Sequence, residues 1–258
     1  MTDAVEVQGG ELVKRHRLST RIWHWINAVA IIVMLMSGLM ISNAHPRLYW
    51  GHYGANLDAA WLDLRDWLPG GRFPGWATIP SQYSLADGRH WHLAFAWVLA
   101  FGLLGYLIVS LLNRHVQRDL ALRRGELAPS HLWEDIKHHA QLRFPTGAAA
   151  LKYNTLQKLA YISVIFVLMP LLILTGLCLM PGMAPLVDWA SSLMGGRQSA
   201  RSIHFIAAGG IAAFIVVHLV LVILAGPYNE IRSMITGRFR VPPDRKAAAI
   251  EEVKGEAA

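Results

Sequence analysis

Four long apolar runs constrain this 258-residue chain more than any other feature. Each is long enough to cross a bilayer as a helix, which takes about 20 residues for about 30 Å of hydrocarbon. The sequence therefore predicts an all-α integral membrane protein, a four-transmembrane-helix bundle. Polar tails, residues 1–21 and 226–258, flank this domain of residues 22–225. We expect the spans at residues 22–42, 91–112, 156–180 and 203–225.

Composition supports a membrane protein and excludes several kinds of site. Hydrophobic residues make up 54% of the chain and charged residues only 16%, whereas a soluble domain carries about 25% charged residues. The single cysteine, Cys178, lies inside an apolar run. This excludes a disulfide framework, a cysteine-ligated iron–sulfur cluster and a haem attached through CxxCH. We expect Cys178 to be a small buried residue.

The distribution of lysine and arginine predicts the orientation. Eighteen of the 24 lie in the two tails and in the connection between the second and third spans, and six lie in the other two connections. By the positive-inside rule both termini are then cytoplasmic. The net charge of +7 follows from this asymmetry, so no nucleic-acid partner is needed to explain it. Because residues 1–21 lack a short apolar stretch with a cleavage site, we expect the first span to direct insertion.

The two long connections differ in character. The first, of about 48 residues, is rich in Trp, Gly and Pro, and within it residues 59–69, AAWLDLRDWLP, are typical of a short amphipathic helix at the membrane interface. Its tryptophans suit an aromatic belt, and a docking surface for an outer partner is the alternative. The inner connection, residues 122–145, is polar, and we expect it to be helical in part.

Four of the twelve histidines lie within the spans, where ionisable residues are costly and usually functional. His204 and His218 share the fourth span. Their spacing of fourteen residues, at about 100° and 1.5 Å each, puts both on one helix face about 21 Å apart. That distance suits two stacked haems, one near each face of the membrane. Given the span directions, His92 can meet His204 near the outer face, and His24 can meet His218 near the inner face.

Depth fits the inner pair less well than the outer pair. His218 lies about seven residues from the end of its predicted span, whereas His24 lies only a few residues from its own. A single intramembrane histidine is ordinarily an interhelical hydrogen-bond partner, but four at paired depths favour ligation of haem iron. Zinc is a poor rival, because these histidines are too far apart along the axis to share one ion.

Three of these histidines follow an arginine by three residues. On a helix that spacing puts both side chains on one face, with the guanidinium one turn nearer to water, where it can pair with a haem propionate. Ordinary flanking arginines are the alternative. The pattern favours His92 over His90 as a ligand without deciding between them. The three arginines are Arg21, Arg89 and Arg201.

These motifs resemble the cytochrome b subunits of nickel–iron hydrogenase, formate dehydrogenase and thiosulfate reductase. RIWHWINA is similar to their first-span pattern R-x-x-H-W-x-N-A, which a small-residue pair follows, here Ser37 and Gly38. HLAFAWVLAFGLLGYLI and RSIHFIAAGGIAAFIVVHLVLVIL are similar to their second and fourth spans. The resemblance covers about residues 12–240. It implies two haem b groups, the same histidine pairs, electron exchange with membrane quinone and a place in the bacterial inner membrane.

The resemblance also implies a quinone site. KYNTLQK, residues 152–158, is similar to the segment that opens the third span of formate dehydrogenase cytochromes, where the quinone ring lies beside the inner haem. The positions carried over are Asn154, Gln157 and His218. Amide donors suit quinone carbonyls, although Asn154 is also a good N-cap for the third helix.

GRQSARSIHF and GPYNEIRSMITGRF look most like cytochromes paired with periplasmic molybdopterin oxidoreductases. The first hypothesis is therefore an electron-transfer subunit between the quinone pool and a periplasmic oxidoreductase with a molybdopterin or metal cofactor. The second is a stand-alone oxidoreductase that links quinone to a small redox species such as superoxide. A haem-free membrane anchor or transporter is the third, and the paired histidines argue against it. We see no nucleophile–base set or phosphate loop, so whether the chain is itself an enzyme stays open.

Overall fold

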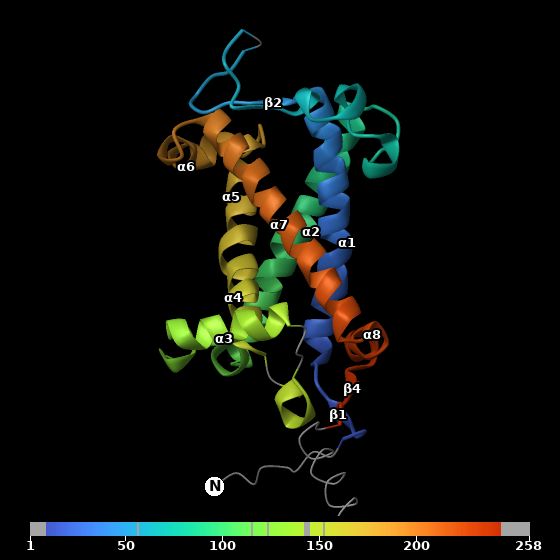
Figure 1. Ribbon diagram of the computed structural model, residues 1–258. Coiled ribbons are helices and arrows are strands. Elements are labelled where there is room, and N and C mark those ends of the chain that lie inside the picture. Colours follow the sequence, from blue (N-terminus) through green and yellow to red (C-terminus); the bar gives the residue numbers. More distant parts are fainter. Residues whose placement is uncertain are drawn as a thin grey trace, which may run out of the picture. The chain divides into compact units, whose positions relative to one another are not determined.

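The computed structural model describes residues 9–55, 57–114, 116–122, 124–141, 145–151 and 153–243. Within them, four helical runs are long and apolar enough to cross a membrane, which confirms the four predicted spans (Figure 1). They are α1 (Leu18–Ala44), α2 (Leu85–Leu112), the run Ala149–Leu179 and α7 (Arg197–Ala225).

The helices α1, α2 and α7 begin four to six residues earlier than hydropathy alone indicates. At the start of α2, the Ser84 hydroxyl accepts a hydrogen bond from the Asp87 N–H at 3.3 Å and donates to the Asp87 carboxylate at 2.7 Å. Such a cap satisfies the first N–H groups, so the helix can begin in a polar segment. The earlier start of α1 at Leu18 puts His24 six residues inside the helix, and His218 lies seven residues before the end of α7. Counted from the ends of their helices, the two histidines therefore have similar positions.

The third span is interrupted in its middle. It consists of α4 (Thr155–Ile162), a π-helical segment η7 (Ser163–Leu168) and α5 (Met169–Leu179). Pro170 explains the interruption, because it has no N–H and its ring crowds the carbonyl four residues earlier. A π turn, with its wider hydrogen-bond spacing, accommodates that lost bond without ending the helix.

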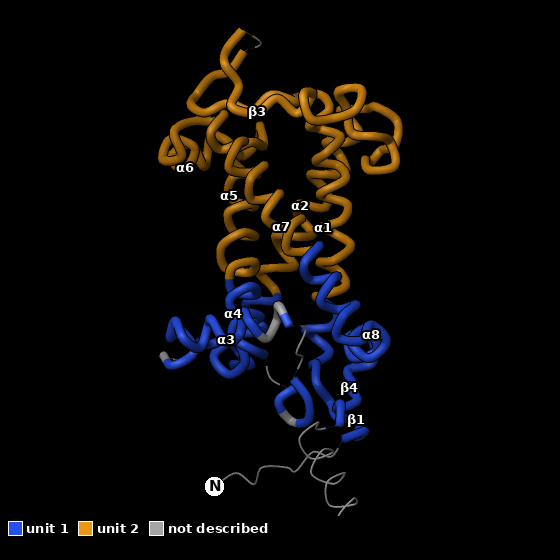
Figure 2. The backbone as a smooth tube through the Cα atoms, viewed as in Figure 1, with its two compact units in different colours: residues 1–23, 106–162, 216–258 blue, residues 24–105, 163–215 orange. Residues whose placement is uncertain are grey.

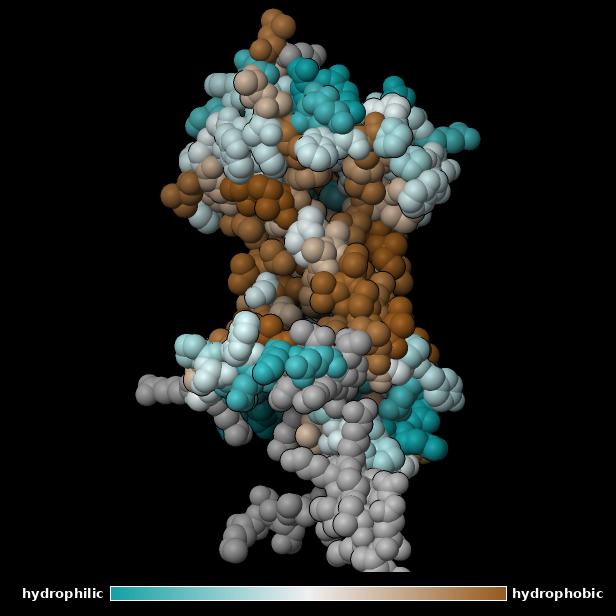
Figure 3. Space-filling model, viewed as in Figure 1, coloured by the Kyte–Doolittle hydropathy of each residue, from teal (hydrophilic) through white to brown (hydrophobic). Residues whose placement is uncertain are grey.

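The chain divides into two compact units (Figure 2). Unit 1 contains residues 1–23, 106–162 and 216–258, and unit 2 contains residues 24–105 and 163–215. In unit 2 the helical segments present an apolar surface, and the connections at one end are more polar (Figure 3). Large apolar side chains such as Val29, Ile32 and Phe101 are exposed on these helices, as a surface in contact with lipid requires.

In unit 2 the connection from α1 to α2 contains a short sheet. β2 (Arg47–Leu48) pairs antiparallel with β3 (Leu62–Asp63), and the 3₁₀ turns η1 (Leu64–Asp66), η2 (Pro69–Gly71) and η3 (Gly75–Ala77) follow. The predicted amphipathic helix over residues 59–69 is therefore wrong. The Asp63 carboxylate pairs with Arg65 at 2.6 Å and with Arg47 at 2.8 Å, which holds this segment as a strand end. The Arg65 guanidinium, and then that of Arg47, keep the pKa of Asp63 well below its usual range.

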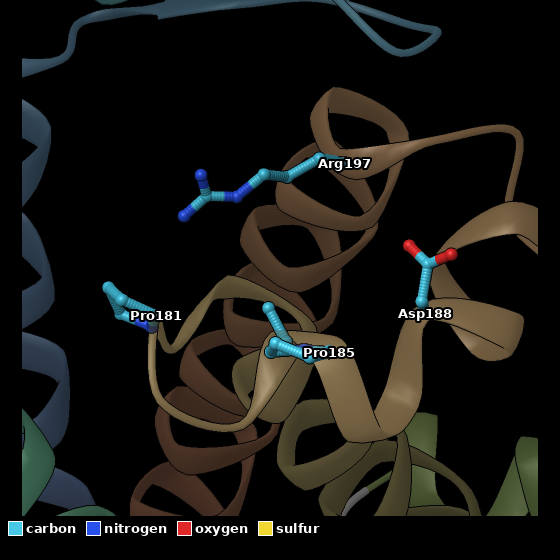
Figure 4. Close-up of a pocket in the computed structure, with 5 residues that line it drawn as sticks. Pro181, Pro185, Asp188 and Arg197 are labelled. Carbon is cyan, nitrogen blue, oxygen red and sulfur yellow. The ribbon is translucent and has the colours of Figure 1, made fainter.

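The connection from α5 to α7 in unit 2 contains η8 (Ala184–Val187) and α6 (Asp188–Leu193). Cys178 packs there with Ala190 and Ala200 and is 2% exposed, which confirms it as a small buried residue. A pocket nearby is lined by Pro181, Ala184, Pro185, Asp188 and Arg197 (Figure 4). None of these five is a predicted site residue, and the side chains of Asp188 and Arg197 do not point toward one another (Figure 4).

Unit 1 joins the two tails. β1 (Leu12–Lys14) pairs antiparallel with β4 (Arg238–Arg240), and α8 (Pro227–Thr236) precedes β4. The even number of spans requires the tails to lie on one side, and this ribbon agrees. The inner connection contains η5 (Arg124–Leu127) and α3 (Pro129–Ala140), which confirms that it is partly helical, and η4 (Val116–Leu120) and η6 (Gly147–Leu151) flank it.

Candidate functional site

His92 of α2 and His204 of α7 face each other in unit 2. Their ring centroids are 6.2 Å apart and their planes meet at 62°. An imidazole nitrogen ligates a transition metal at about 2 Å and the ring centre lies about 1 Å beyond, so two imidazoles on opposite sides of one metal have centroids about 6 Å apart. Each histidine lies seven residues after the first residue of its helix. The predicted outer pair is therefore brought together with room for one metal ion.

Hydrogen bonds to the other ring nitrogen decide which tautomer is present. The Ser37 hydroxyl lies 3.0 Å from His92 Nδ1, and the Thr175 hydroxyl lies 2.8 Å from His204 Nδ1. Each hydroxyl donates its single hydrogen to the carbonyl four residues earlier on its own helix, at 2.6 and 2.7 Å. Each must then accept from the imidazole, which puts the ring proton on Nδ1. Nε2 keeps its lone pair, as a metal ligand requires.

A glycine follows each of these hydroxyl residues. A Cβ added at Gly38 would lie 3.5 Å from His92 Cε1, and one added at Gly176 would lie 3.5 Å from His204 Cε1. The two imidazoles therefore lie against the helix backbone at these glycines, within van der Waals reach of an added methyl group. α1 and α5 thus present the same pair, a hydroxyl and then a glycine, to a histidine of the neighbouring helix.

Only part of this arrangement could be recognised in the sequence. Ser37 and Gly38 stand out there as a small-residue pair, whereas their hydrogen bond and the matching pair Thr175 and Gly176 do not. The available signal was the repetition of a hydroxyl–glycine dipeptide, SG and TG, inside the first and third spans. A serine or threonine hydroxyl that donates to the carbonyl one turn earlier is common in helices with apolar surroundings. The dipeptide alone therefore does not reveal a histidine partner.

The structure also distinguishes the neighbouring histidines of α2. His90 is exposed, whereas the ring of His92 faces His204. His92 is therefore the residue placed to act as a ligand. His24 belongs to unit 2 and His218 to unit 1, so the pairing of these two histidines stays a prediction from the sequence.

The predicted propionate arginines near His92 and His204 lie beside another histidine. One Arg201 nitrogen donates to the backbone carbonyls of His45 and Arg47, at 2.5 and 3.0 Å, and so ties the connection after α1 to α7. Burial lowers the pKa of His45, and the positive charges of Arg201 and Arg89 lower it further. Both guanidinium groups are therefore near enough to His45 to act on it electrostatically, and guanidinium groups pair well with carboxylates. No motif in the sequence had singled out His45.

Arg21, the third predicted propionate arginine, has its contacts in unit 1. Its Nε donates to the Met234 carbonyl at 3.4 Å, and another of its nitrogens donates to the Ile235 carbonyl. These carbonyls belong to the last turn of α8, so Arg21 acts there as a C-terminal cap. Its propionate role rests on the sequence pattern alone.

The predicted quinone residues form a helix cap. Asn154 Oδ1 accepts from the Gln157 N–H at 2.8 Å, and Gln157 Oε1 accepts from the Asn154 N–H at 3.3 Å. This reciprocal pair begins α4 and confirms the alternative that Asn154 is an N-cap. Next to it, Lys158 forms an ion pair with Glu126 at 2.8 Å. Lys152, the first residue of the quinone-like segment, lies outside the described residues.

The donor set fits a haem better than a metal ion held by protein alone. Among the described residues, no group of three or more His, Cys, Asp or Glu side chains could hold a metal ion. A metal between His92 and His204 therefore takes two protein ligands and needs its equatorial donors from elsewhere. A porphyrin would supply them, and His92 and His204 would hold its iron.

Comparison with known proteins gives a consistent result. The family described as prokaryotic cytochrome b561 matches residues 15–237. The chain is 26% identical over 218 residues to the putative protein-methionine-sulfoxide reductase subunit YedZ1 of Azospira oryzae, covering 83% of this chain and 92% of that protein. It is 23% identical over 253 residues to the probable Ni/Fe-hydrogenase B-type cytochrome subunit of Cupriavidus necator, covering 93% and 88%. It is 26% identical over 238 residues to the putative cytochrome YdhU of Escherichia coli, covering 90% and 76%. The resemblance to hydrogenase cytochromes is confirmed.

We predict that Thr175→Val retains haem and raises the midpoint potential of the haem that His204 holds. The Nδ1–H···O bond makes the imidazole a more basic ligand, which stabilises ferric iron more than ferrous iron. Valine has nearly the same shape as threonine and cannot accept that bond. A redox titration followed by haem absorbance measures the change, and Thr175→Ser, which keeps the hydroxyl, should keep the wild-type potential.

The corresponding change at the other hydroxyl is Ser37→Ala, and Ser42→Ala is its matched control. The Ser42 hydroxyl makes the same kind of bond to a backbone carbonyl, to Gly38 at 2.9 Å, on the same helix as Ser37. We expect Ser37→Ala to raise the potential and Ser42→Ala to leave it unchanged. Wild-type potentials in both Thr175→Val and Ser37→Ala would show that these hydroxyls do not act on the ligands.

Proposed function

Because the chain belongs to the prokaryotic cytochrome b561 family, we propose that it carries electrons between membrane quinone and a periplasmic oxidoreductase through two haem b groups. The family and the four long apolar helices make it an integral membrane protein that binds haem b. The observation that carries the proposal is the facing pair His92 and His204, 6.2 Å between centroids. Nδ1 of each ring forms a hydrogen bond with Ser37 or Thr175. Nε2 of each ring is therefore the nitrogen that can ligate a metal ion.

The first haem lies between α2 and α7 in this proposal. Bound there, it supplies one-electron redox chemistry at iron, and the protein tunes the potential through ligand basicity and burial. His92 and His204 hold the iron. Arg89 and Arg201 neutralise the propionates, with His45 beside them as a neutral group that adds no charge.

The second haem lies between His24 and His218. α7 is one continuous helix through His204 and His218, so the argument that both face one side about 21 Å apart applies to the folded helix. His24 lies six residues inside α1, a depth similar to that of His218 from the other end of α7. These positions support two stacked haems, with electrons passing from one to the other along the bundle.

The quinone site in this proposal lies at the start of α4, with Asn154 and Gln157 near His218. The cap uses the Asn154 side-chain oxygen as an acceptor. Its amide nitrogen is a donor of the kind that a quinone carbonyl takes. Cap and quinone ligand are therefore compatible roles for one residue.

The partner in this proposal docks at the periplasmic face, and both termini lie in the cytoplasm. The asymmetry of lysine and arginine supports this orientation. The relatives support a partner of the oxidoreductase class, since one is named as a hydrogenase cytochrome subunit and another as a reductase subunit. An oxidoreductase with a molybdopterin or metal cofactor fits both names. The bacterial inner membrane is the compartment that this arrangement requires.

We predict that His92→Ala and His24→Ala each leave one haem per chain instead of two. Removing one axial imidazole leaves the iron of that site with a single protein ligand. The pyridine haemochrome assay on purified protein counts the haems. His90→Ala, an exposed change on the same helix, is the control and should retain both. Two haems in either His92→Ala or His24→Ala would show that the corresponding pairing is wrong.

We predict that Asn154→Asp slows reduction of the haems by a quinol roughly threefold to tenfold, which is the effect of one lost hydrogen bond. Aspartate keeps the acceptor oxygen and is an equally good N-cap, so thermal unfolding should be unchanged. Stopped-flow absorbance measures the quinol rate, and dithionite reduction of the same sample should stay at the wild-type rate. A wild-type quinol rate in Asn154→Asp would remove Asn154 from the quinone site.

Orientation and partner can be tested from one engineered thiol. The native Cys178 is 2% exposed, whereas Trp76, between α1 and α2, is 83% exposed. We predict that a membrane-impermeant maleimide labels Trp76→Cys in intact spheroplasts. A thiol-linked photocrosslinker at this position should then capture a cofactor-bearing periplasmic subunit.

Arg238→Cys, at an exposed position of β4, is the matched control and should react only after lysis. The reverse labelling pattern would invert the proposed orientation. No crosslinked subunit, together with direct oxidation of the haems by superoxide, would replace the partner proposal with a stand-alone oxidoreductase.

A further inference from the structure

The helix α8 in unit 1 (Figure 1) exposes its large apolar side chains instead of burying them. Tyr228, Ile231 and Ile235 are spaced three and four residues apart, so they form one stripe along the helix. They are 79%, 45% and 56% exposed. A surface helix of a soluble protein does the opposite and packs such a stripe against the core.

The polar side of α8 is the side that contacts the protein. Glu230 forms an ion pair with Arg15 at 3.1 Å. Asn229 accepts from the Arg240 N–H at 3.0 Å and donates to the Arg240 carbonyl at 2.9 Å. Ser233, in the middle of this side, is fully buried. Polar contacts therefore hold α8 against the β1–β4 ribbon, and its apolar stripe is left facing outward.

The ribbon beside α8 concentrates positive charge on one face. Lys14 of β1 lies directly opposite Arg238 of β4, and Leu12 lies opposite Arg240. Because side chains alternate along a strand, these residues share a face, and all of them are exposed. Like charges directly opposite each other in a sheet are destabilising. An anion between these cations removes that repulsion, and the carboxylate of α8, Glu230, is already paired with Arg15.

We propose that α8 and the β1–β4 ribbon together bind an anionic phospholipid. α8 begins two residues after α7, a membrane-spanning helix, ends at Ala225. Chain continuity therefore puts the apolar stripe at the boundary between acyl chains and headgroups. A helix with one apolar face and neighbouring cations is the usual element at that depth. Tyr228, Ile231 and Ile235 contact the acyl chains, and Lys14, Arg238 and Arg240 bind the headgroup phosphate.

Native mass spectrometry of the detergent-purified, full-length protein tests this surface by titration with phosphatidylglycerol and with phosphatidylcholine. We expect the wild-type protein to bind phosphatidylglycerol more tightly. Each cation near an anionic lipid contributes a factor of about five to affinity, so Arg238→Gln combined with Arg240→Gln should weaken phosphatidylglycerol binding about 25-fold. Binding of phosphatidylcholine should not change.

Arg17→Gln combined with Arg72→Gln is the control, because it removes the same charge from exposed positions off the ribbon. It should keep the wild-type preference. The combination of Tyr228→Ser, Ile231→Ser and Ile235→Ser should weaken binding of both lipids while helix content, measured by circular dichroism, is retained.

Three results would overturn the proposal. The first is equal affinity of the wild-type protein for the two lipids. The second is displacement of phosphatidylglycerol by millimolar inorganic phosphate, which would make the ribbon a free-phosphate site. The third is a wild-type dimer that the triple serine variant abolishes, because a second copy of the chain would then cover the stripe.

Discussion

Hydrocarbon offers no hydrogen-bond partners, and this constraint decides where polar atoms are placed within the spans. Backbone groups are satisfied inside helices, and hydroxyl groups are satisfied by the carbonyl one turn earlier. Ser37 and Thr175 follow this rule with bonds of 2.6 and 2.7 Å. Once its hydrogen is used in this way, each hydroxyl can only accept, and the acceptor faces a histidine. The same constraint that satisfies the hydroxyl therefore sets the tautomer of the histidine.

The site is built on helices, so its geometry depends on how closely they approach. Gly38 and Gly176 bring α1 and α5 against the imidazoles of α2 and α7. Each imidazole is thus packed against a neighbouring helix. Side chains whose orientation is fixed in this way would need little rearrangement to bind a metal ion.

Where the chain leaves the membrane, the polar and apolar sides of α8 are arranged in the reverse of the way expected in water. α8 packs Glu230, Asn229 and Ser233 against the protein and presents Tyr228, Ile231 and Ile235 outward. In water this arrangement would leave apolar area exposed without compensation. At a membrane surface it is favourable, because acyl chains cover the stripe and headgroups meet the cations of the ribbon. The polarity of α8 is therefore explained by its surroundings and by its continuity with α7.

Features that depend on neighbours along the chain could be read from the sequence. The four spans follow from the length of their apolar runs, and the common face of His204 and His218 follows from helix periodicity. The cap formed by Asn154 and Gln157 is equally local. The tertiary structure alone decided that His92, and not His90, faces His204, and that Ser37 and Thr175 form hydrogen bonds with these two imidazoles. These bonds join residues 55 and 29 positions apart, and no local pattern specifies such a partner.

The strand at Leu62–Asp63 in place of a helix has the same cause, since its ladder and its ion pair are made with Arg47. Local periodicity determines a helix and the face it presents, whereas the choice of partner depends on contacts that exist only after the helices have packed.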